Sequence, residues 1–442
     1  MKLPRITILC AALALAHAAQ AQSLLELVDS ARAYDAAYQS ARAQYDATLA
    51  RAEQARSAVL PTIGLGASMS RTNQDVTIDN VPGNSTRSFG TNTLGLNATQ
   101  PLYRPANWAS YEQGRKQADL ASAQLNAAEQ DLIVRVSQAY FDVLAAQDSL
   151  TFVKAQKSAV SEQLASAKRN FEVGTATITD TREAQARFDL VTAQEIATEN
   201  DLRVKRLALD QLVGKTGTEP KALRQPLSLP ALDPADVEAW VQRALAQNPN
   251  IAQARVGLDV ADLEVSKAQA GHKPTVDVTA SYSMVRSIDG SSSAAMGSRA
   301  NVGTIGINLS LPLFAGYAIQ NRVKETLALQ EKARSDLENA SRSVAQGTRT
   351  AYFGVLSGQG QVKALEAAEA SSLSALDANK LGYQVGVRIN IDVLNAQSQL
   401  FDTKAKLAKA RYDVLVGGLR LRQAVGSLSV SDLAPISALL AP

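Results

Sequence analysis

Side chains that could carry out catalysis are sparse in this chain of 442 residues. After a predicted leader peptide, the only histidine is His272, which stands beside Pro274 at the expected end of a helix. No H-E-x-x-H, G-x-S-x-G or P-loop motif occurs, and the G-L-G at residues 64–66 lacks the rest of a dinucleotide fingerprint. We therefore expect no enzymatic activity, no metal site and no cofactor.

The polar residues that stand out belong to a repeated segment, which reads F-E-V-G-T-A-T-I-T-D-T at 171–181 and Y-Q-V-G-V-R-I-N-I-D-V-L-N at 383–395. Each copy has a glycine where a helical pattern stops, Gly174 or Gly386, because glycine adopts positive φ without a Cβ clash. Each has an aspartate where the next helix starts, Asp180 or Asp392, which suits a cap or first-turn position. Both segments are predicted to be tight turns between long helices.

These turns belong to a duplication that spans the chain after the leader. Motifs recur at an offset of 211 to 213 residues: P-T-I at 61–63 with P-T-V at 274–276, L-G-L-N at 94–97 with I-G-I-N at 305–308, and A-Y-F at 139–141 with A-Y-F at 351–353. Chance does not hold one offset across so many matches. The predicted organisation is a first repeat at 22–213, a connector at 214–232, a second repeat at 233–430 and a short tail at 431–442.

Residues 1–21 have the pattern of a secretory signal peptide, with Lys2 and Arg5 before an apolar run and a closing A-Q-A cleavage site. The only cysteine, Cys10, lies inside this leader. Cleavage lowers the formal charge from +3 to +1, so net charge gives no support for nucleic-acid binding. No later apolar run reaches the roughly 18 residues of a spanning helix. If this exported protein crosses a membrane, it would therefore do so as strands.

Each repeat is expected to begin with a helix, at about Leu24–Val59 in the first and Pro234–His272 in the second. Asp233 before the proline is a strong start signal, a cap followed by proline in the first turn. Pro61 and Pro274 end the two helices.

Two alternating strands follow in each repeat, at about 61–73 and 90–103 in the first and about 274–286 and 300–313 in the second. The alternation gives every strand one apolar and one polar face, a pattern that a membrane barrel shares with a soluble β-sandwich. Four strands cannot close a barrel, and lipid does not tolerate open sheet edges. A barrel would therefore require an oligomer, and three chains would supply twelve strands.

Long helices then run over about Pro105–Phe171 and Tyr317–Tyr383, close to 67 residues each, or about 100 Å if continuous. They return over about Thr179–Val213 and Ile391–Val425. The last return helix has a heptad of large apolar residues: Val393, Leu400, Leu407, Val414, Leu421 and Leu428. Small residues follow the first five by three positions, which permits close left-handed packing, either in a tube or in a coiled coil within one chain.

The leader, the duplicated helix–strand–strand–helix–helix pattern and the V-G-x-x-x-x-x-D turns resemble the TolC family of outer-membrane efflux proteins over about Ser23–Leu433. The resemblance implies a homotrimer that combines helices and strands. A twelve-stranded β-barrel would sit in the outer-membrane lipid of a Gram-negative-type envelope. It would continue into a twelve-helix α-helical barrel in the periplasm, with the connector and tail in an equatorial belt.

The same resemblance implies a passive export duct for drugs or polypeptides, in a tripartite efflux or type I secretion system. Its partners would be a periplasmic adaptor (membrane fusion) protein and an inner-membrane RND or ABC transporter, and the periplasmic tip would be gated. The alternative from another class is an exported helical scaffold or adhesin with a soluble β-sandwich and no pore.

By position, the resemblance assigns a latch that holds the closed tip to Thr179, Asp180, Tyr383 and Arg388. Arg388 can pair with Asp180, and the Tyr383 hydroxyl can donate a hydrogen bond to that carboxylate.

Three further tip positions follow from the resemblance. Gln163 matches a latch residue, but its partner position holds Lys380 in place of an acid. The pore entrance of the family is ringed by two aspartates per chain, three residues apart. Asp392 matches the first, whereas Asn395 occupies the second position. With half the carboxylates, the entrance is expected to select cations more weakly.

Overall fold

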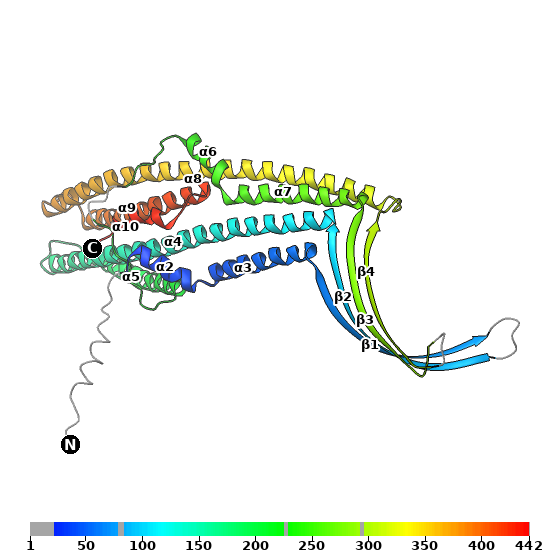
Figure 1. Ribbon diagram of the computed structural model, residues 1–442. Coiled ribbons are helices and arrows are strands. Elements are labelled where there is room, and N and C mark those ends of the chain that lie inside the picture. Colours follow the sequence, from blue (N-terminus) through cyan, green and yellow to red (C-terminus); the bar gives the residue numbers. More distant parts are fainter. Residues whose placement is uncertain (1–21, 78–83, 225–228, 292–295, 442) are drawn as a thin grey trace, which may run out of the picture. The chain divides into compact units, whose positions relative to one another are not determined.

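The computed structural model describes residues 22–77, 84–224, 229–291 and 296–441 (Figure 1). The predicted signal peptide lies outside this part of the chain. The chain divides into two compact units, and each is built from corresponding pieces of both repeats. Unit 1 takes the described residues of Met1–Ala43, Ala123–Ala252 and Ala340–Pro442, and unit 2 takes those of Gln44–Ser122 and Gln253–Asn339.

The helices recur in pairs of nearly equal length, in agreement with the duplication. The pairs are α2 Leu24–Tyr34 with α6 Val237–Gln247, α3 Ala36–Arg56 with α7 Pro249–Gln269, α4 Pro105–Glu172 with α8 Ala318–Gln384, and α5 Ile178–Val213 with α9 Asn390–Val425. The 3₁₀ turns η1 (Ser57–Val59) and η2 (Ala270–His272) also correspond, and η3 (Val430–Leu433) with α10 (Ala434–Ser437) follows the second repeat. Both long helices lie within one residue of their predicted ends.

The first helix of each repeat is broken once, which the sequence analysis did not predict. Asp35 separates α2 from α3, and Asn248 separates α6 from α7, each with an extended backbone. The Asp35 carboxylate accepts from the N–H of Tyr38 at 2.8 Å, and the Asn248 side-chain oxygen accepts from the N–H of Asn250 at 2.8 Å. A short polar side chain that caps the following helix interrupts the helical pattern at these two points.

The start of the helix in the second repeat was also predicted wrongly. Asp236, not Asp233, caps α6, and its carboxylate accepts from the N–H of Glu238 at 3.2 Å. The carbonyl of Pro234 accepts from the indole N–H of Trp240 at 2.8 Å. Pro234 therefore precedes α6 and is held by a side chain of that helix, six residues further along the chain.

Unit 2 contains a four-stranded antiparallel sheet in the order β1-β2-β3-β4. Its strands are β1 Thr62–Thr77, β2 Asn84–Tyr103, β3 Thr275–Ile288 and β4 Ser298–Ser310. The pairing of β2 with β3, with Leu96 opposite Tyr282, joins the two repeats in one sheet. The predicted strands overlap these four and differ most at β2, which begins at Asn84 and not at residue 90.

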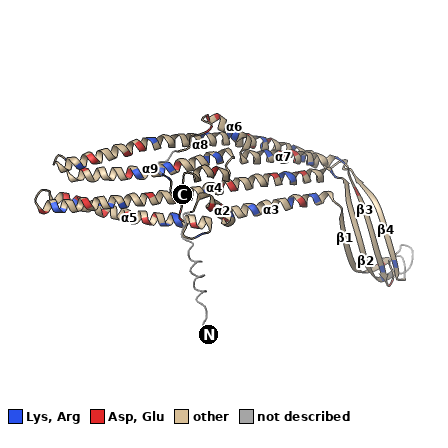
Figure 2. Ribbon diagram, turned by 60° about the vertical axis from the view of Figure 1, so that its left-hand side comes forward, with Lys and Arg blue, Asp and Glu red and all other residues tan. Residues whose placement is uncertain are grey.

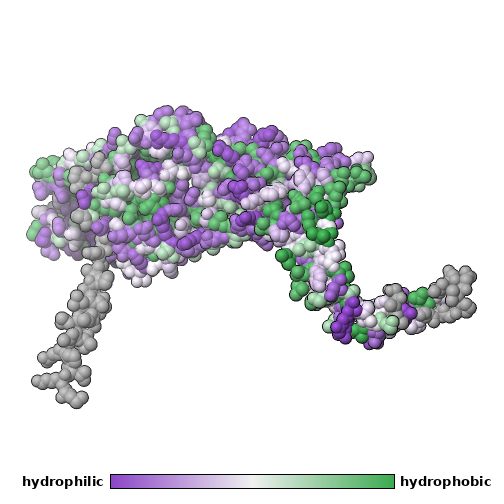
Figure 3. All heavy atoms as spheres, in the orientation of Figure 1, coloured by the Kyte–Doolittle hydropathy of each residue, from purple (hydrophilic) through white to green (hydrophobic). Residues whose placement is uncertain are grey.

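Large apolar side chains stay exposed on the two edge strands of this sheet. Ile63 on β1 is 72% exposed and Ile305 on β4 is 80% exposed. Figure 3 shows hydrophobic residues gathered over the part of the sheet next to the helices. Within the described residues no second sheet packs on this one. The β-sandwich of the alternative interpretation, in which such side chains would be covered, is therefore not formed.

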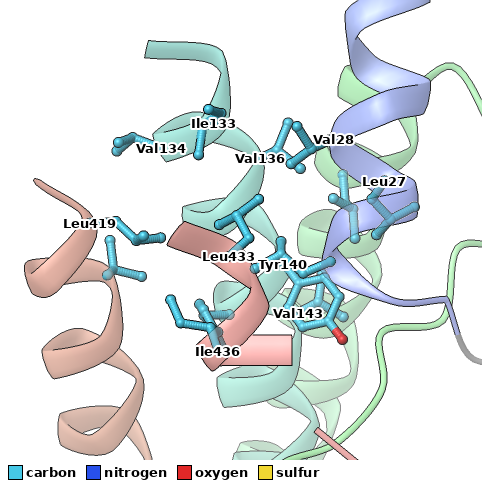
Figure 4. Packing of buried hydrophobic residues seen from close by; sticks show 14 of the residues in the cluster. Leu27, Val28, Ile133, Val134, Val136, Tyr140, Val143, Leu419, Leu433 and Ile436 are labelled. Atoms are coloured by element: carbon cyan, nitrogen blue, oxygen red, sulfur yellow. The ribbon is translucent and has the colours of Figure 1, made fainter. Parts of the chain in front are cut away.

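The core of unit 1 lies where α2, α4, α9 and the C-terminal turns meet (Figure 4). Its members are apolar and almost fully buried: Leu27, Val28, Ile133, Val136, Tyr140, Val143, Leu419, Leu433 and Ile436. The Tyr140 hydroxyl donates to the carbonyl of Lys221 at 2.9 Å, which ties the connector to α4. This core fixes the first pair of long helices, α4 and α5, against α9 of the second pair.

The predicted heptad of α9 packs inward, since Val393, Leu400, Leu407, Val414 and Leu421 are all buried. Leu428 is buried as well but lies beyond the end of α9 at Val425. Charged residues are spread along the helices and are few in the strands (Figure 2). None of the helices that the structure describes has a stretch long and apolar enough to span a bilayer.

Candidate gate at the two helical tips

The turns that join α4 to α5 and α8 to α9 lie beside each other at one end of unit 1 (Figures 1 and 2). Gly174 and Gly386 have φ of 81° and 79°, a conformation that favours glycine. At each tip, two consecutive N–H groups donate to one carbonyl of the last helical turn. That carbonyl is Asn170 in the first tip, at 2.8 and 3.2 Å, and Gly382 in the second, at 2.9 and 3.1 Å. The two tips therefore share one backbone conformation.

The side chain of Asp180 takes part in the cap at the start of α5. Its carboxylate accepts from the N–H of Thr177 at 2.9 Å and from the Thr177 hydroxyl at 2.7 Å, and its own N–H donates back to that hydroxyl at 3.2 Å. Thr179 lies next to it and is exposed. Negative charge at a helix N-terminus is stabilised by the helix dipole. Asp180 is thus positioned at the tip surface by its own helix.

The structure places Arg388 away from its predicted partner. Its nearest carboxylate is that of Asp392, one helical turn on, at 3.7 Å. Within the described chain no ion pair joins Arg388 to Asp180. Tyr383 does not reach Asp180 either, and its hydroxyl accepts from the side-chain amide of Asn170 at 3.3 Å. The predicted latch is therefore not made inside one chain and stays a prediction for contacts between chains.

Gln163 has a partner that the sequence analysis did not consider. Its side-chain N–H donates to the side-chain oxygen of Asn390, the first residue of α9, which is fully buried. The amide nitrogen of Asn390 donates in turn to the carbonyl of Asp180 at 3.3 Å. Lys380, at the expected partner position, is exposed. One buried amide thus connects α9 to both α4 and α5.

The two expected entrance positions lie one turn apart on α9. Asp392 is half-buried, and Asn395 is exposed. The side-chain oxygen of Asn395 accepts from Nη2 of Arg187 on α5 at 2.7 Å. The Asp392 carboxylate therefore has Arg388 nearby, and the Asn395 side chain accepts a hydrogen bond from the guanidinium of Arg187 on α5.

Together these contacts form what we call the tip seam, a row of polar pairs between the first coil (α4 and α5) and the second coil (α8 and α9). Its members are Gln163–Asn390–Asp180, Asn170–Tyr383, Arg187–Asn395 and Gln156–Ser398, the last at 3.2 Å. Leu394 of α9 is fully buried in an apolar cluster with Val160 and Leu164 of α4, which supports the same contact. The seam holds the two coils of one chain together at the tip.

Asn170, Arg187 and Asn390 were missed as site residues. For Asn390 the duplication offers a signal, because the corresponding residue of the first repeat is the apolar Ile178. An amide at a position that its repeat fills with isoleucine indicates a specific hydrogen bond when the site is buried. Among the described residues, no group of three or more His, Cys, Asp or Glu side chains is placed to hold a metal ion.

Comparison with known proteins shows which family has this architecture. A model of the outer membrane efflux protein family matches residues 27–215 and 240–427. The chain is 35% identical over 426 residues to the outer membrane protein TolC of Vibrio cholerae, covering 96% of this chain and 95% of that protein. It is 32% identical over 408 residues to the alkaline protease secretion protein AprF of Pseudomonas aeruginosa, covering 91% and 84%.

Solved structures show the same fold. The outer membrane protein VceC of Vibrio cholerae matches with a TM-score of 0.76 at 20% identity, over 91% of this chain and 96% of that one. The CmeC outer membrane channel of Campylobacter jejuni matches with a TM-score of 0.77 at 18% identity, over 94% and 89%.

The chain therefore belongs to the outer membrane efflux protein family, which confirms the resemblance to TolC. Its place is the outer membrane of a Gram-negative-type envelope. Members of the family are transport ducts and not enzymes. The scaffold or adhesin alternative is not supported.

Proposed function

We propose that this chain is one third of an outer-membrane exit duct that exports drugs or polypeptides passively through a gated periplasmic tip. The observation that carries the proposal is the four-stranded sheet with unpaired edges at β1 and β4 and with exposed apolar side chains on both edge strands. Such edges are not stable in lipid unless the sheet closes on itself. Three copies pairing β4 with β1 would close a twelve-stranded barrel.

The helices also support assembly with further copies of this chain. α5 exposes Leu190, Ile196, Val204 and Leu207, and α8 exposes Phe353 and Leu356. Over its whole described length, by contrast, α9 exposes no large apolar side chain. Neighbouring copies would cover the apolar faces of α5 and α8, and the polar face of α9 would meet water. Four long helices from each of three chains would form a twelve-helix barrel.

The strand–helix junctions suit an interface with lipid headgroups. Tyr103, Trp108, Phe314 and Tyr317 are all exposed there. Two edge-to-face pairs lie here, Trp108 with Tyr111 at 6.2 Å and Phe314 with Tyr317 at 5.6 Å between ring centroids. Tryptophan and tyrosine gather at membrane–water interfaces because one end of each side chain is apolar and the other polar.

The tips are the proposed docking point for a periplasmic adaptor, which would connect the duct to an inner-membrane RND or ABC transporter. Val173, Val385, Val387 and Ile389 are exposed around the two turns. Apolar residues collected at an exposed end favour contact with another protein. The relative AprF is named for secretion of alkaline protease, and CusC of Escherichia coli is named for cation efflux. Export of a polypeptide and efflux of a small solute are therefore both consistent with this architecture.

The proposal is tested by purifying the protein in detergent, measuring its mass and inserting it into a planar lipid bilayer. We expect a trimer that requires detergent and conducts ions in single-channel steps. A buffer-soluble monomer without conductance would contradict both the barrel and the duct.

A further inference from the structure

We propose that Arg187 sets the ion preference of the duct entrance, so that the entrance favours anions relative to a ring of two aspartates per chain. The inference rests on the proposed function and adds a residue that determines its selectivity. Its starting point is the contact between the Arg187 guanidinium and Asn395.

The geometry places a positive charge where the family arrangement has a negative one. Nη2 of Arg187 donates to the side-chain oxygen of Asn395 at 2.7 Å, and Asn395 follows Asp392 by three residues on the same helix. The second entrance position is therefore not simply neutral. The amide oxygen of Asn395 has no charge to compensate the guanidinium, which keeps its full positive charge because arginine does not deprotonate in proteins.

In the described chain, nearby carboxylates make no ion pair with this guanidinium. Asp189, two residues further on α5, accepts from the side chain of Gln185 at 2.9 Å. Asp402 of α9 pairs with Lys406 at 2.6 Å. Glu183 stands one turn before Arg187 and makes no ion pair with it in the described chain. The hydrogen bond to Asn395 is thus the contact that positions the Arg187 charge.

The net charge at the two entrance positions follows from counting the charged groups that lie in contact there. Each chain contributes the Asp392 carboxylate, the Arg388 guanidinium at 3.7 Å from it, and the Arg187 guanidinium on Asn395. These three charges sum to +1 per chain, whereas two aspartates with one arginine would sum to −1. Rings of charged side chains decide which ions enter a pore. Phosphorylated or carboxylate-bearing solutes and acidic polypeptides would therefore meet a lower barrier here.

The test is the reversal potential of the reconstituted full-length trimer in a potassium chloride gradient. Salt should be kept near 0.1 M or lower. The Debye length is about 10 Å at 0.1 M and becomes shorter at higher salt, where the effect of these charges on a passing ion would be screened. We expect Arg187→Gln to shift the reversal potential toward cation preference, and Asp392→Asn to shift it the other way. Arg187→Lys, which keeps the charge, should stay close to the original protein.

Arg182→Gln is the matched control, since Arg182 is an exposed arginine of α5 near the same tip. It removes the same charge without touching the entrance positions, and we expect a clearly smaller shift. An equal shift from Arg182→Gln, or none from Arg187→Gln, would overturn the inference while single-channel conductance persists. Absence of any conductance in the original protein would instead contradict the proposed function.

A second variant tests the contact itself. Asn395→Asp places a carboxylate at hydrogen-bond distance from Arg187, so the pair should neutralise itself. The reversal potential should then move toward cation preference about as far as in Arg187→Gln, because each change lowers the charge of the entrance by one per chain. In the Arg187→Gln background the same substitution leaves the new carboxylate without its partner and should move the reversal potential further in the same direction. If Arg187→Gln does not assemble, Asn395→Asp alone decides the question, and no shift toward cation preference would overturn the inference.

Discussion

At the scale of single residues, Asn390 is the most constrained polar group of the tip. It is fully buried, accepts from Gln163 and donates to the carbonyl of Asp180. Its counterpart in the first repeat is Ile178, which is exposed. The two repeats therefore differ where the second coil meets the first, and this difference holds the coils together.

We expect Asn390→Leu to loosen the closed tip. The change leaves the Gln163 amide without its partner and removes the added bond to the Asp180 carbonyl, and a buried unsatisfied group costs about 1–3 kcal/mol. The second coil should then separate from the first more often, which would raise the single-channel conductance of the resting duct. Gln399→Leu replaces an exposed amide on the same helix and serves as the control. Equal conductance in both variants would show that the buried amide does not restrain the tip.

The predicted latch gives a separate test, because its contacts would lie between chains. Arg388→Ser combined with Tyr383→Phe removes the guanidinium and the hydroxyl assigned to the pairing with Asp180. We expect a higher resting conductance and an unchanged amount of assembled trimer. The change Tyr383→Phe also removes the acceptor for Asn170, at 3.3 Å in this chain, so the single change Arg388→Ser, which leaves that contact in place, reports on the latch alone. If the double variant conducts like the original protein, these residues are not the latch.

At the scale of elements, the sequence predicted the long helices well and their contacts poorly. α4 and α8 contain no proline after their first residues, and their ends coincide with strong glycine signals, so their ranges could be predicted within one residue. The break at Asp35 was missed because alanine-rich periodicity continues across it. The break at Asn248 has a signal that was overlooked, Pro249, which disfavours helical backbone at the residue before it. The partners of Gln163 and Asn395 could not be predicted, since they depend on how two coils pack side by side.

The break at Asp35 makes the stability of unit 1 depend on pH. Arg135 on α4 donates two hydrogen bonds of 3.0 Å to the Asp35 carboxylate, and this lowers the pKa of Asp35 below its ordinary value. Because the pKa is lowered in the folded chain, the carboxylate stabilises the fold above the unfolded value of about 3.9. This contribution is lost as the pH falls through the lower, folded value.

We expect Arg135→Met to lower the free energy of unfolding by about 1.5–3 kcal/mol near neutral pH, where Asp35 would be left charged and without its partner. Asp35→Asn should keep the bond to the N–H of Tyr38, since the side-chain oxygen of Asn248 accepts from the N–H of Asn250 at the corresponding break of the second repeat. Heat-induced unfolding followed between pH 3 and 7 measures both effects. The Asn variant should lose part of the acid sensitivity, and an unchanged pH profile would mean that Asp35 is not a source of it.

At the scale of the whole molecule, the exposed edge strands determine what the chain requires in order to be stable. On β4, Ile305 is 80% exposed and alternates with small and polar residues, and the same alternation runs along β1. In water this face would be a site of aggregation. In a closed barrel it would face lipid, and the opposite face would line the water-filled interior. We therefore expect the single sheet to be stable only as part of an assembly in a membrane.

This argument predicts opposite outcomes for the same substitution at adjacent residues of β4. Ile305→Lys places a charge on the proposed lipid face, where it costs about 2–4 kcal/mol near the bilayer midplane and less toward the interfaces. Thr304→Lys places the same charge on the other face of the strand, where water would solvate it. We expect less heat-resistant trimer in the outer membrane for the first variant and near-normal amounts for the second. If the two variants assemble equally well, the apolar face of the sheet does not contact lipid, and closure of the barrel from three chains loses its main support.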